Sequence, residues 1–113
     1  MCMNISKEDL LRINKGFGGS LRDDSSLDFA FDKIKNKKIG MYKKLAYLTR
    51  AILVDHPFSD GNKRTATFLV FAFAEAHKKA VDRELLVYQI ISIAKNNIYD
   101  IRNIENRLRT AIK

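Results

Sequence analysis

Residues 56 to 78 read HPFSDGNKRTATFLVFAFAEAHK, a polar loop that runs directly into a long apolar segment. From residue 65 to 78 the side chains are apolar on nearly every side, a pattern that fits either a buried strand or a helix. We favour a helix because the segment is long, holds four alanines and ends in His77, Lys78 and Lys79, whose charges suit a helix C-terminus. Such a helix is expected at the centre of a bundle.

Apolar residues recur at helical spacing on both sides of this segment, and short polar stretches separate the repeats. Residues 6 to 9, Ser-Lys-Glu-Asp, form a capping box ahead of the first repeat, and Pro57 closes the third. The expected helices span about 7–17, 42–55, 65–78, 83–95 and 101–112, and a further one begins at residue 27, after a cap at Ser25 or Ser26, and ends within the lysine-rich stretch 35–38. The sequence therefore predicts one all-α domain over residues 1 to 113, a compact six-helix bundle in which the loop at His56 joins the third helix to a central, buried fourth helix.

Composition excludes several classes of protein. Hydrophobic residues make up 46% and charged residues 30% of the 113 residues, which is ordinary for a globular domain and argues against wholesale disorder. The single cysteine, Cys2, has no partner for an internal disulfide, so a reducing cytoplasm is expected. The longest apolar run, Phe68 to Ala74, is too short to cross a bilayer. The net charge of +8 favours an acidic partner, a nucleotide or a nucleic acid without choosing among them.

The loop itself has the chemistry of a phosphate site. Gly61 allows a sharp turn and a close approach to a ligand. The backbone N–H groups of Asn62, Lys63 and Arg64 stand at the start of the following helix, where they lack acceptors within the helix and favour an anion. The guanidinium of Arg64 adds a planar set of donors that matches phosphate oxygens, and Lys63 adds a mobile positive charge.

Two further side chains of the loop, Asp60 and His56, supply different functions. The Asp60 carboxylate is a hard oxygen ligand, suited to a Mg²⁺ ion that keeps most of its waters and bridges to phosphate oxygens. His56 can take the proton from an attacking hydroxyl. An isolated His and Asp at this spacing would most simply be a chance pair in a surface turn. Acting together with the phosphate-binding groups, they would suit a transfer reaction that depends on positioning and charge neutralisation.

The string His56 to Arg64 is similar to the signature of the Fic/DOC family, which reads His-x-Phe-x-acid-(Gly or Ala)-Asn-(Gly or Lys)-Arg. Ile5 to Leu10 also resembles the opening helix of the Doc toxins. The resemblance implies the six-helix fold of that family, with ATP and Mg²⁺ as cofactors. It further implies that His56 is the general base and that Asp60 is the metal ligand.

Other roles in the loop follow from the same resemblance. The nucleotide would be held by Gly61, Asn62, Lys63 and Arg64. The backbone N–H groups of Gly61 and Asn62 would form an anion hole, and Asn62 and Arg64 would bind phosphates. Phe58 would anchor the loop in the core. A hairpin flap that aligns the target protein in this family is expected near residues 35 to 42, and its candidate docking residues are Lys37, Lys38, Ile39 and Gly40.

Lys63 distinguishes two reactions. Family members that transfer AMP usually have a glycine at this position, whereas Doc toxins carry a lysine and transfer the γ-phosphate of ATP. The resemblance therefore implies a Doc-like toxin of a toxin-antitoxin system that phosphorylates a Ser or Thr hydroxyl of a target protein. Likeness to Doc implies that this target is a translation elongation factor. Pro57 and Gly61 look like the AMP-transferring members, so AMP transfer to a protein hydroxyl is the alternative.

Many family members restrain themselves with an inhibitory helix of the form Ser/Thr-x-x-x-Glu-Gly/Asn. The nearest match here, Glu105-Asn106, has Ile101 where the hydroxyl residue should stand. An acidic antitoxin acting in trans is therefore expected, with the lysines between Lys33 and Lys44 either as its docking patch or as a solvated face. A non-catalytic basic module that binds nucleic acid or regulates is the second alternative, although the usual base-reading signatures are absent.

Overall fold

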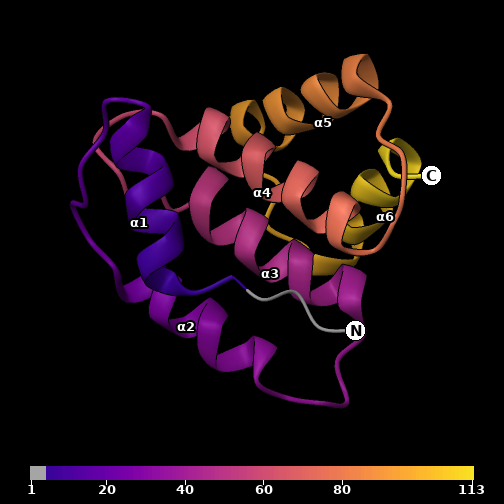
Figure 1. Ribbon diagram of the computed structural model, residues 1–113, viewed down its shortest axis with the longest axis horizontal. Coiled ribbons are helices and arrows are strands. Elements are labelled where there is room, and N and C mark those ends of the chain that lie inside the picture. The colour runs from indigo at the N-terminus through magenta and orange to yellow at the C-terminus, as the bar shows by residue number, and fades with distance from the viewer. Residues whose placement is uncertain (1–4) are drawn as a thin grey trace.

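Six helices make up residues 5 to 113, the part of the chain that the computed structural model describes (Figure 1). They are α1 (Lys7–Gly16), α2 (Ser25–Ile34), α3 (Met41–Leu53), α4 (Asn62–Ala76), α5 (Arg83–Lys95) and α6 (Ile101–Ala111). The extended pairings within these residues are two isolated bridges, Leu21 with Phe58 and Val81 with Ile112. The predicted all-α fold is therefore confirmed. Cys2 lies outside the described residues.

Helices α3 and α4 form the centre of the bundle. α3 packs against α2, α4, α5 and α6, and α4 packs against α1, α3 and α5. In Figure 1 they run side by side through the middle of the molecule, with α1 and α2 to the left and α5 and α6 to the upper right. α3 is buried along most of its length, and its buried residues are Tyr42, Leu45, Ala46, Leu48, Thr49, Ala51, Ile52 and Leu53.

Helix α4 carries the apolar segment, but it is not covered on every side. It begins at Asn62, earlier than the expected Thr65, and its buried face includes Leu69 and Phe73. Phe68 remains 47% exposed because it lines an open groove between α4 and α5. The expectation of a central fourth helix is met, with the difference that one apolar stripe of that helix faces the groove.

Side-chain caps fix the start of three helices. Ser6 and Asp9 form the predicted capping box of α1, in which each side chain accepts a hydrogen bond from the backbone N–H of the other. These bonds, first of all the one from the Ser6 backbone, lower the pKa of Asp9. Asp82 and Asp100 cap α5 and α6 by accepting from a backbone N–H in the first turn. The local signals in the sequence therefore placed these helix starts correctly.

Contacts between distant segments tie the helices together. The Lys7 ammonium pairs with Asp24 at 2.7 Å and with Asp28 at 2.8 Å, which joins α1 to α2 and raises the pKa of Lys7. At the other end of the chain, the Asp82 N–H donates to the carbonyl of Ala111 at 2.8 Å beside the Val81 bridge. In residues 5 to 113, none of the helices is long and apolar enough to span a membrane.

The cap of α6 gives a direct test of this arrangement. Asp100→Ala removes the acceptor of the Asn103 N–H and is expected to lower the free energy of unfolding by about 1 kcal/mol. Asp100→Ser keeps a capping oxygen and should recover most of that loss. Urea denaturation of the three proteins measures the difference, and equal stability of the Ala and Ser variants would contradict the cap.

Candidate nucleotide site at the start of helix α4

The loop from residue 54 to 61 carries the chain from the end of α3 to the start of α4, and the segment between α1 and α2 holds it in place. The carbonyl of Pro57 accepts hydrogen bonds from the backbone N–H groups of Arg22 and Asp23, at 2.7 and 3.2 Å. The Ser59 N–H donates to the carbonyl of Ser20 at 2.8 Å. These bonds flank the Leu21 to Phe58 bridge, so a short stretch of paired backbone fixes the loop.

Phe58 and Asn62 fix the loop from the inside. Phe58 is 1% exposed and belongs to the hydrophobic core, which is where a residue that anchors the loop is expected to lie. The side-chain amide of Asn62 donates to the Phe58 carbonyl at 3.0 Å and accepts from the Phe58 N–H at 3.3 Å. Both polar ends of this amide are thus used within the loop. The backbone N–H of Asn62, in place of its side chain, is the group available to a phosphate.

The first turn of α4 is open toward a hollow of about 380 Å³. Gly61 is the N-cap and provides no side-chain acceptor, and the first bond closed within the helix is from the Thr65 N–H to the Gly61 carbonyl at 2.9 Å. The N–H groups of the three preceding residues therefore have no acceptor inside the helix. The hollow in front of them is lined by Phe17, His56, Ser59, Asp60, Gly61, Asn62, Lys63 and Arg64.

The turn at Gly61 favours glycine. Its φ of +75° lies in the left-handed region, which other residues enter at a cost. A Cβ atom there would lie 3.2 Å from Nδ2 of Asn14 and 3.3 Å from Cβ of Phe17. The glycine thus lets the chain turn tightly under α1 and brings the amides of α4 to the mouth of the hollow.

Asp60 lies at the edge of the hollow with its side chain exposed. One carboxylate oxygen, Oδ1, accepts from the Gly61 N–H at 2.8 Å, so the carboxylate sits at the opening of the anion site. No group of three or more His, Cys, Asp or Glu side chains gathers anywhere in residues 5 to 113. One protein carboxylate beside a phosphate cradle fits Mg²⁺, which takes its other ligands from water and from the phosphates it bridges.

His56 lines the same hollow and is exposed to it. Its φ of +49° places a non-glycine residue in the left-handed region immediately before Pro57. This backbone conformation costs about 1–2 kcal/mol, and the paired backbone at Pro57 holds it in place. An imidazole held at the mouth of an anion site by strained backbone is arranged for proton transfer to or from a bound group.

A family model described as Fic/DOC family matches residues 4–74, which include α1 to α3, the whole loop and all of α4 except its last two residues. The chain belongs to the Fic/DOC family. Membership supports a protein-modifying transferase function, for which Fic proteins generally use ATP and a divalent metal. Searches of curated proteins and of solved structures returned no match. Helices α5 and α6 lie beyond the matched range and complete the bundle around α3 and α4.

The side chains of Lys63 and Arg64 place two positive charges at the hollow of this Fic/DOC domain. Both side chains are exposed on the first turn of α4 and line the hollow together with His56. They also line the apolar groove between α4 and α5, where Phe68 and Phe71 are among the neighbours. The phosphate site is therefore continuous with an apolar surface of the same helix.

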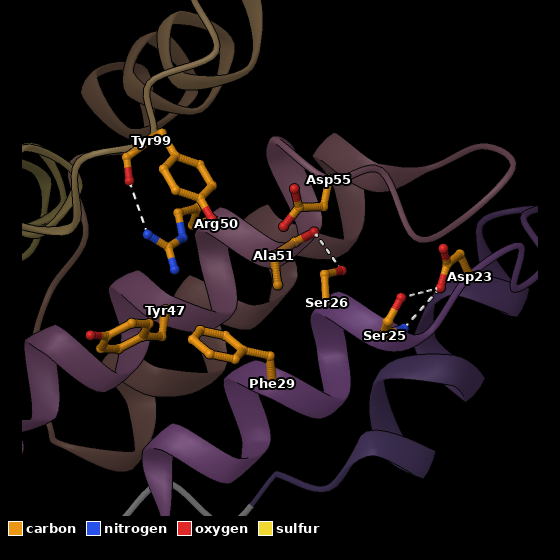
Figure 2. A pocket seen from close by; sticks show the side chains of 9 residues that line it. All are labelled: Asp23, Ser25, Ser26, Phe29, Tyr47, Arg50, Ala51, Asp55 and Tyr99. Carbon is orange, nitrogen blue, oxygen red and sulfur yellow. Dashed lines mark hydrogen bonds between the residues drawn. The ribbon is translucent and has the colours of Figure 1, made fainter.

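A second pocket, of about 430 Å³, lies on the other side of the loop beside Asp55 (Figure 2). It contains the carboxylates of Asp23 and Asp55, and hydrogen bonds from Ser25 lower the pKa of Asp23. The Arg50 guanidinium lies 4.1 Å from the centre of the Tyr99 ring and donates to the Tyr99 carbonyl. Two carboxylates make this pocket a poorer candidate for a phosphate site than the hollow at α4.

The structure does not bring the expected flap residues to the Fic motif. Lys37, Lys38, Ile39 and Gly40 lie in the turns before α3, whereas the motif follows α3. The 13 residues of α3 separate the two by about 20 Å. The segment that lies against the motif is Ser20 to Asp23. The family hairpin does not form at residues 37–40 because the connection between α2 and α3 is too short, and no strand is found among residues 5 to 113 outside the isolated bridges.

Two features of the site were missed in the sequence: the segment at Ser20 and the buried Asn14 beside the loop. Both had a signal. Asn14 follows Leu10 by four residues, so a polar side chain falls on the apolar stripe of α1. The signal for the segment at Ser20 is the pair Gly18-Gly19 directly before it. Gly19 is buried, and a Cβ atom there would lie 2.3 Å from the Asp60 carbonyl oxygen, so this glycine allows the two loops to touch.

The strained backbone of His56 predicts an inverted order of stability for two variants. His56→Gly should be more stable than His56→Ala by about 1 kcal/mol, because glycine adopts a positive φ without penalty. The matched pair at Asn106, an exposed position inside α6, should show the opposite order. Denaturant titration compares the four proteins. A more stable Ala variant at residue 56 would rule out the left-handed backbone there.

Proposed function

We propose that this Fic/DOC domain transfers the γ-phosphate of ATP to a Ser or Thr hydroxyl of a target protein, as the toxin of a toxin-antitoxin pair. The observation that carries the proposal is the uncapped start of α4, where three free N–H groups, Lys63 and Arg64 share one hollow with an exposed His56. A translation elongation factor is the target that likeness to the Doc toxins suggests.

Each side chain has a separate task in this reaction. The N–H groups of α4 and the Arg64 guanidinium bind and orient the phosphates, and Asp60 holds the Mg²⁺ that comes with them. MgATP, when bound, would supply the phosphoryl group, with ADP leaving as the bond between the β- and γ-phosphates breaks and Mg²⁺ offsetting the charge on the phosphates. His56 accepts the proton of the target hydroxyl as the oxygen bonds to phosphorus, a role worth about 10²- to 10⁴-fold in rate. Ser20 to Asp23, beside the motif, takes over the position expected for the flap.

Lys63 supports γ-phosphate transfer over AMP transfer. Its side chain lines the hollow at the amino end of α4, where it fills space and adds a positive charge. A glycine there would leave that space to the terminal phosphates, as in AMP-transferring relatives. Pro57 and Gly61 resemble those relatives, and AMP transfer is therefore the second candidate function.

Restraint of the activity is assigned to a partner. Within residues 5 to 113 no glutamate lines the hollow, and Glu105 of α6 instead accepts from Arg109 at 3.2 Å. An acidic antitoxin binding in trans fits the net charge of +8. The lysines from Lys33 to Lys44 gather at the opposite end of α3 from the motif and offer such an antitoxin a second contact. We place this activity in the cytoplasm, where ATP and Mg²⁺ are abundant, with no role for a membrane.

Labelled ATP separates the candidate functions. With Mg²⁺ and whole-cell lysate, label from γ-³²P-ATP should appear on a protein band, while α-³²P-ATP should give none. His56→Ala should reduce the label by at least about 100-fold with the fold intact by circular dichroism. Transfer of the α-label would establish AMP transfer in its place. No transfer of either label, together with tight duplex binding that falls steeply with salt, would favour the nucleic-acid module.

Exchange of one side chain should change the reaction. Lys63→Gly removes the charge and the bulk in the hollow, so transfer of γ-label is expected to fall while transfer of α-label rises above background. Lys63→Arg keeps a cation there and should not gain α-transfer. Both variants are compared in the same labelling assay. An unchanged ratio of γ- to α-label in Lys63→Gly would show that this residue does not select the reaction.

A further inference from the structure

Asn14 is a buried polar residue of α1 that contacts the motif from outside. It is 1% exposed, and its Nδ2 donates to the backbone carbonyl of Asp60 at 2.8 Å and to Oγ1 of Thr65 at 3.2 Å. Asp60 and Thr65 stand on either side of the Gly61 turn. One side chain from the first helix therefore bridges the turn that ends the loop and starts α4.

The orientation of the Asn14 amide is fixed by its partners. A backbone carbonyl only accepts hydrogen bonds, so the group facing the Asp60 carbonyl must be Nδ2. Oδ1 then points where no donor reaches it, and it is a buried polar atom without a partner. Leaving a buried polar atom without a partner is unfavourable, so a polar side chain at this core position calls for a specific reason.

Two glycines complete a tight cluster around this amide. A Cβ atom on Gly19 would lie 2.3 Å from Oδ1 of Asn14 and 2.3 Å from the Asp60 carbonyl oxygen. On Gly61 it would lie 3.2 Å from Nδ2. The carbonyl of Asn14 also accepts from the N–H groups of Phe17 and Gly19, at 2.9 and 3.1 Å. Asn14 thus fixes the α1 to α2 connection and the motif turn with one residue.

We propose that Asn14 is a positioning residue of the nucleotide site. By holding the Asp60 carbonyl and the Thr65 hydroxyl, it keeps Gly61 in its left-handed conformation and sets the direction of the Asp60 carboxylate, which the proposed function makes the Mg²⁺ ligand. The effect of Asn14 on the Mg²⁺ ligand rests on the proposed function. Its effect on the Gly61 turn does not, and the turn can be measured without reference to any reaction.

Removal of the amide should loosen the turn without emptying the core. Asn14→Asp is nearly isosteric, but it replaces the Nδ2 donor by an oxygen that faces the Asp60 carbonyl and can meet the Thr65 hydroxyl only as an acceptor. Asn14→Ala removes both hydrogen bonds and avoids a buried charge. Residues that orient a metal ligand are typically worth about 10- to 100-fold in metal affinity or activity. The Mg²⁺ concentration that half-saturates ATP binding is expected to rise by that factor in either variant.

The experiment uses the full chain and two readouts. Calorimetric titration of ATP at several Mg²⁺ concentrations gives the half-saturating Mg²⁺ value, and ¹⁵N relaxation gives the order parameter of the Gly61 N–H. That parameter should fall from about 0.85 toward about 0.6 in Asn14→Ala. Leu10→Ala is the matched control, because it truncates a fully buried residue of the same helix that makes no polar contact with the motif. It should lower stability with little change in either readout.

The outcomes separate this inference from the proposed function. If Asn14→Ala and Leu10→Ala shift the Gly61 order parameter and the Mg²⁺ requirement equally, Asn14 is only a packing residue and the inference is wrong. If the wild-type chain transfers no label but the Asn14 readouts move as expected, the proposed reaction fails while the positioning role stands. Asn14→Ala also decides the matter alone if the buried carboxylate of Asn14→Asp prevents folding.

Discussion

The site depends on backbone hydrogen bonds between two loops that are far apart in the sequence. The Pro57 carbonyl accepts from Arg22 and Asp23, and Ser59 donates to Ser20. Two left-handed residues, His56 and Gly61, lie at the ends of the stretch that these bonds hold. Without that hold, the strain at His56 would relax and the imidazole would leave the mouth of the hollow. The geometry of the candidate site therefore depends on the contact between the loops as much as on the motif.

Helix α4 and the core behind it supply the rigid part of the site. Phe58 enters the core, the Asn62 amide closes onto its backbone, and α4 then continues as a buried element of four turns against α3. The N–H groups at the start of α4 are consequently fixed before any ligand arrives. Preorganised donors of this kind need no rearrangement at the moment of reaction, which is why they contribute strongly to catalysis.

The helices and the position of the site were accessible from the sequence because their causes are local. Apolar spacing, the Ser6 box and the caps at Asp82 and Asp100 each act within one or two turns. The Gly61 turn followed from the glycine and the helix after it. The pairing of Ser20 with Ser59 did not follow, since its cause is a contact across 39 residues. The position of the flap was wrong for the same reason. The connection from α2 meets the first end of α3, whereas the motif loop leaves from its last end, and only the folded structure shows how far apart the two lie.

Helix α3 gives the domain two working ends. The Fic motif follows its last residue, Leu53, and the lysines between Lys33 and Lys44 lie on either side of its first residue, Met41, with the buried length of α3 between the two ends. A protein that binds only at the lysine end leaves the mouth of the hollow accessible. Binding at the two ends is therefore separable, and a binder raised against the lysines would hold this domain with its hollow still open.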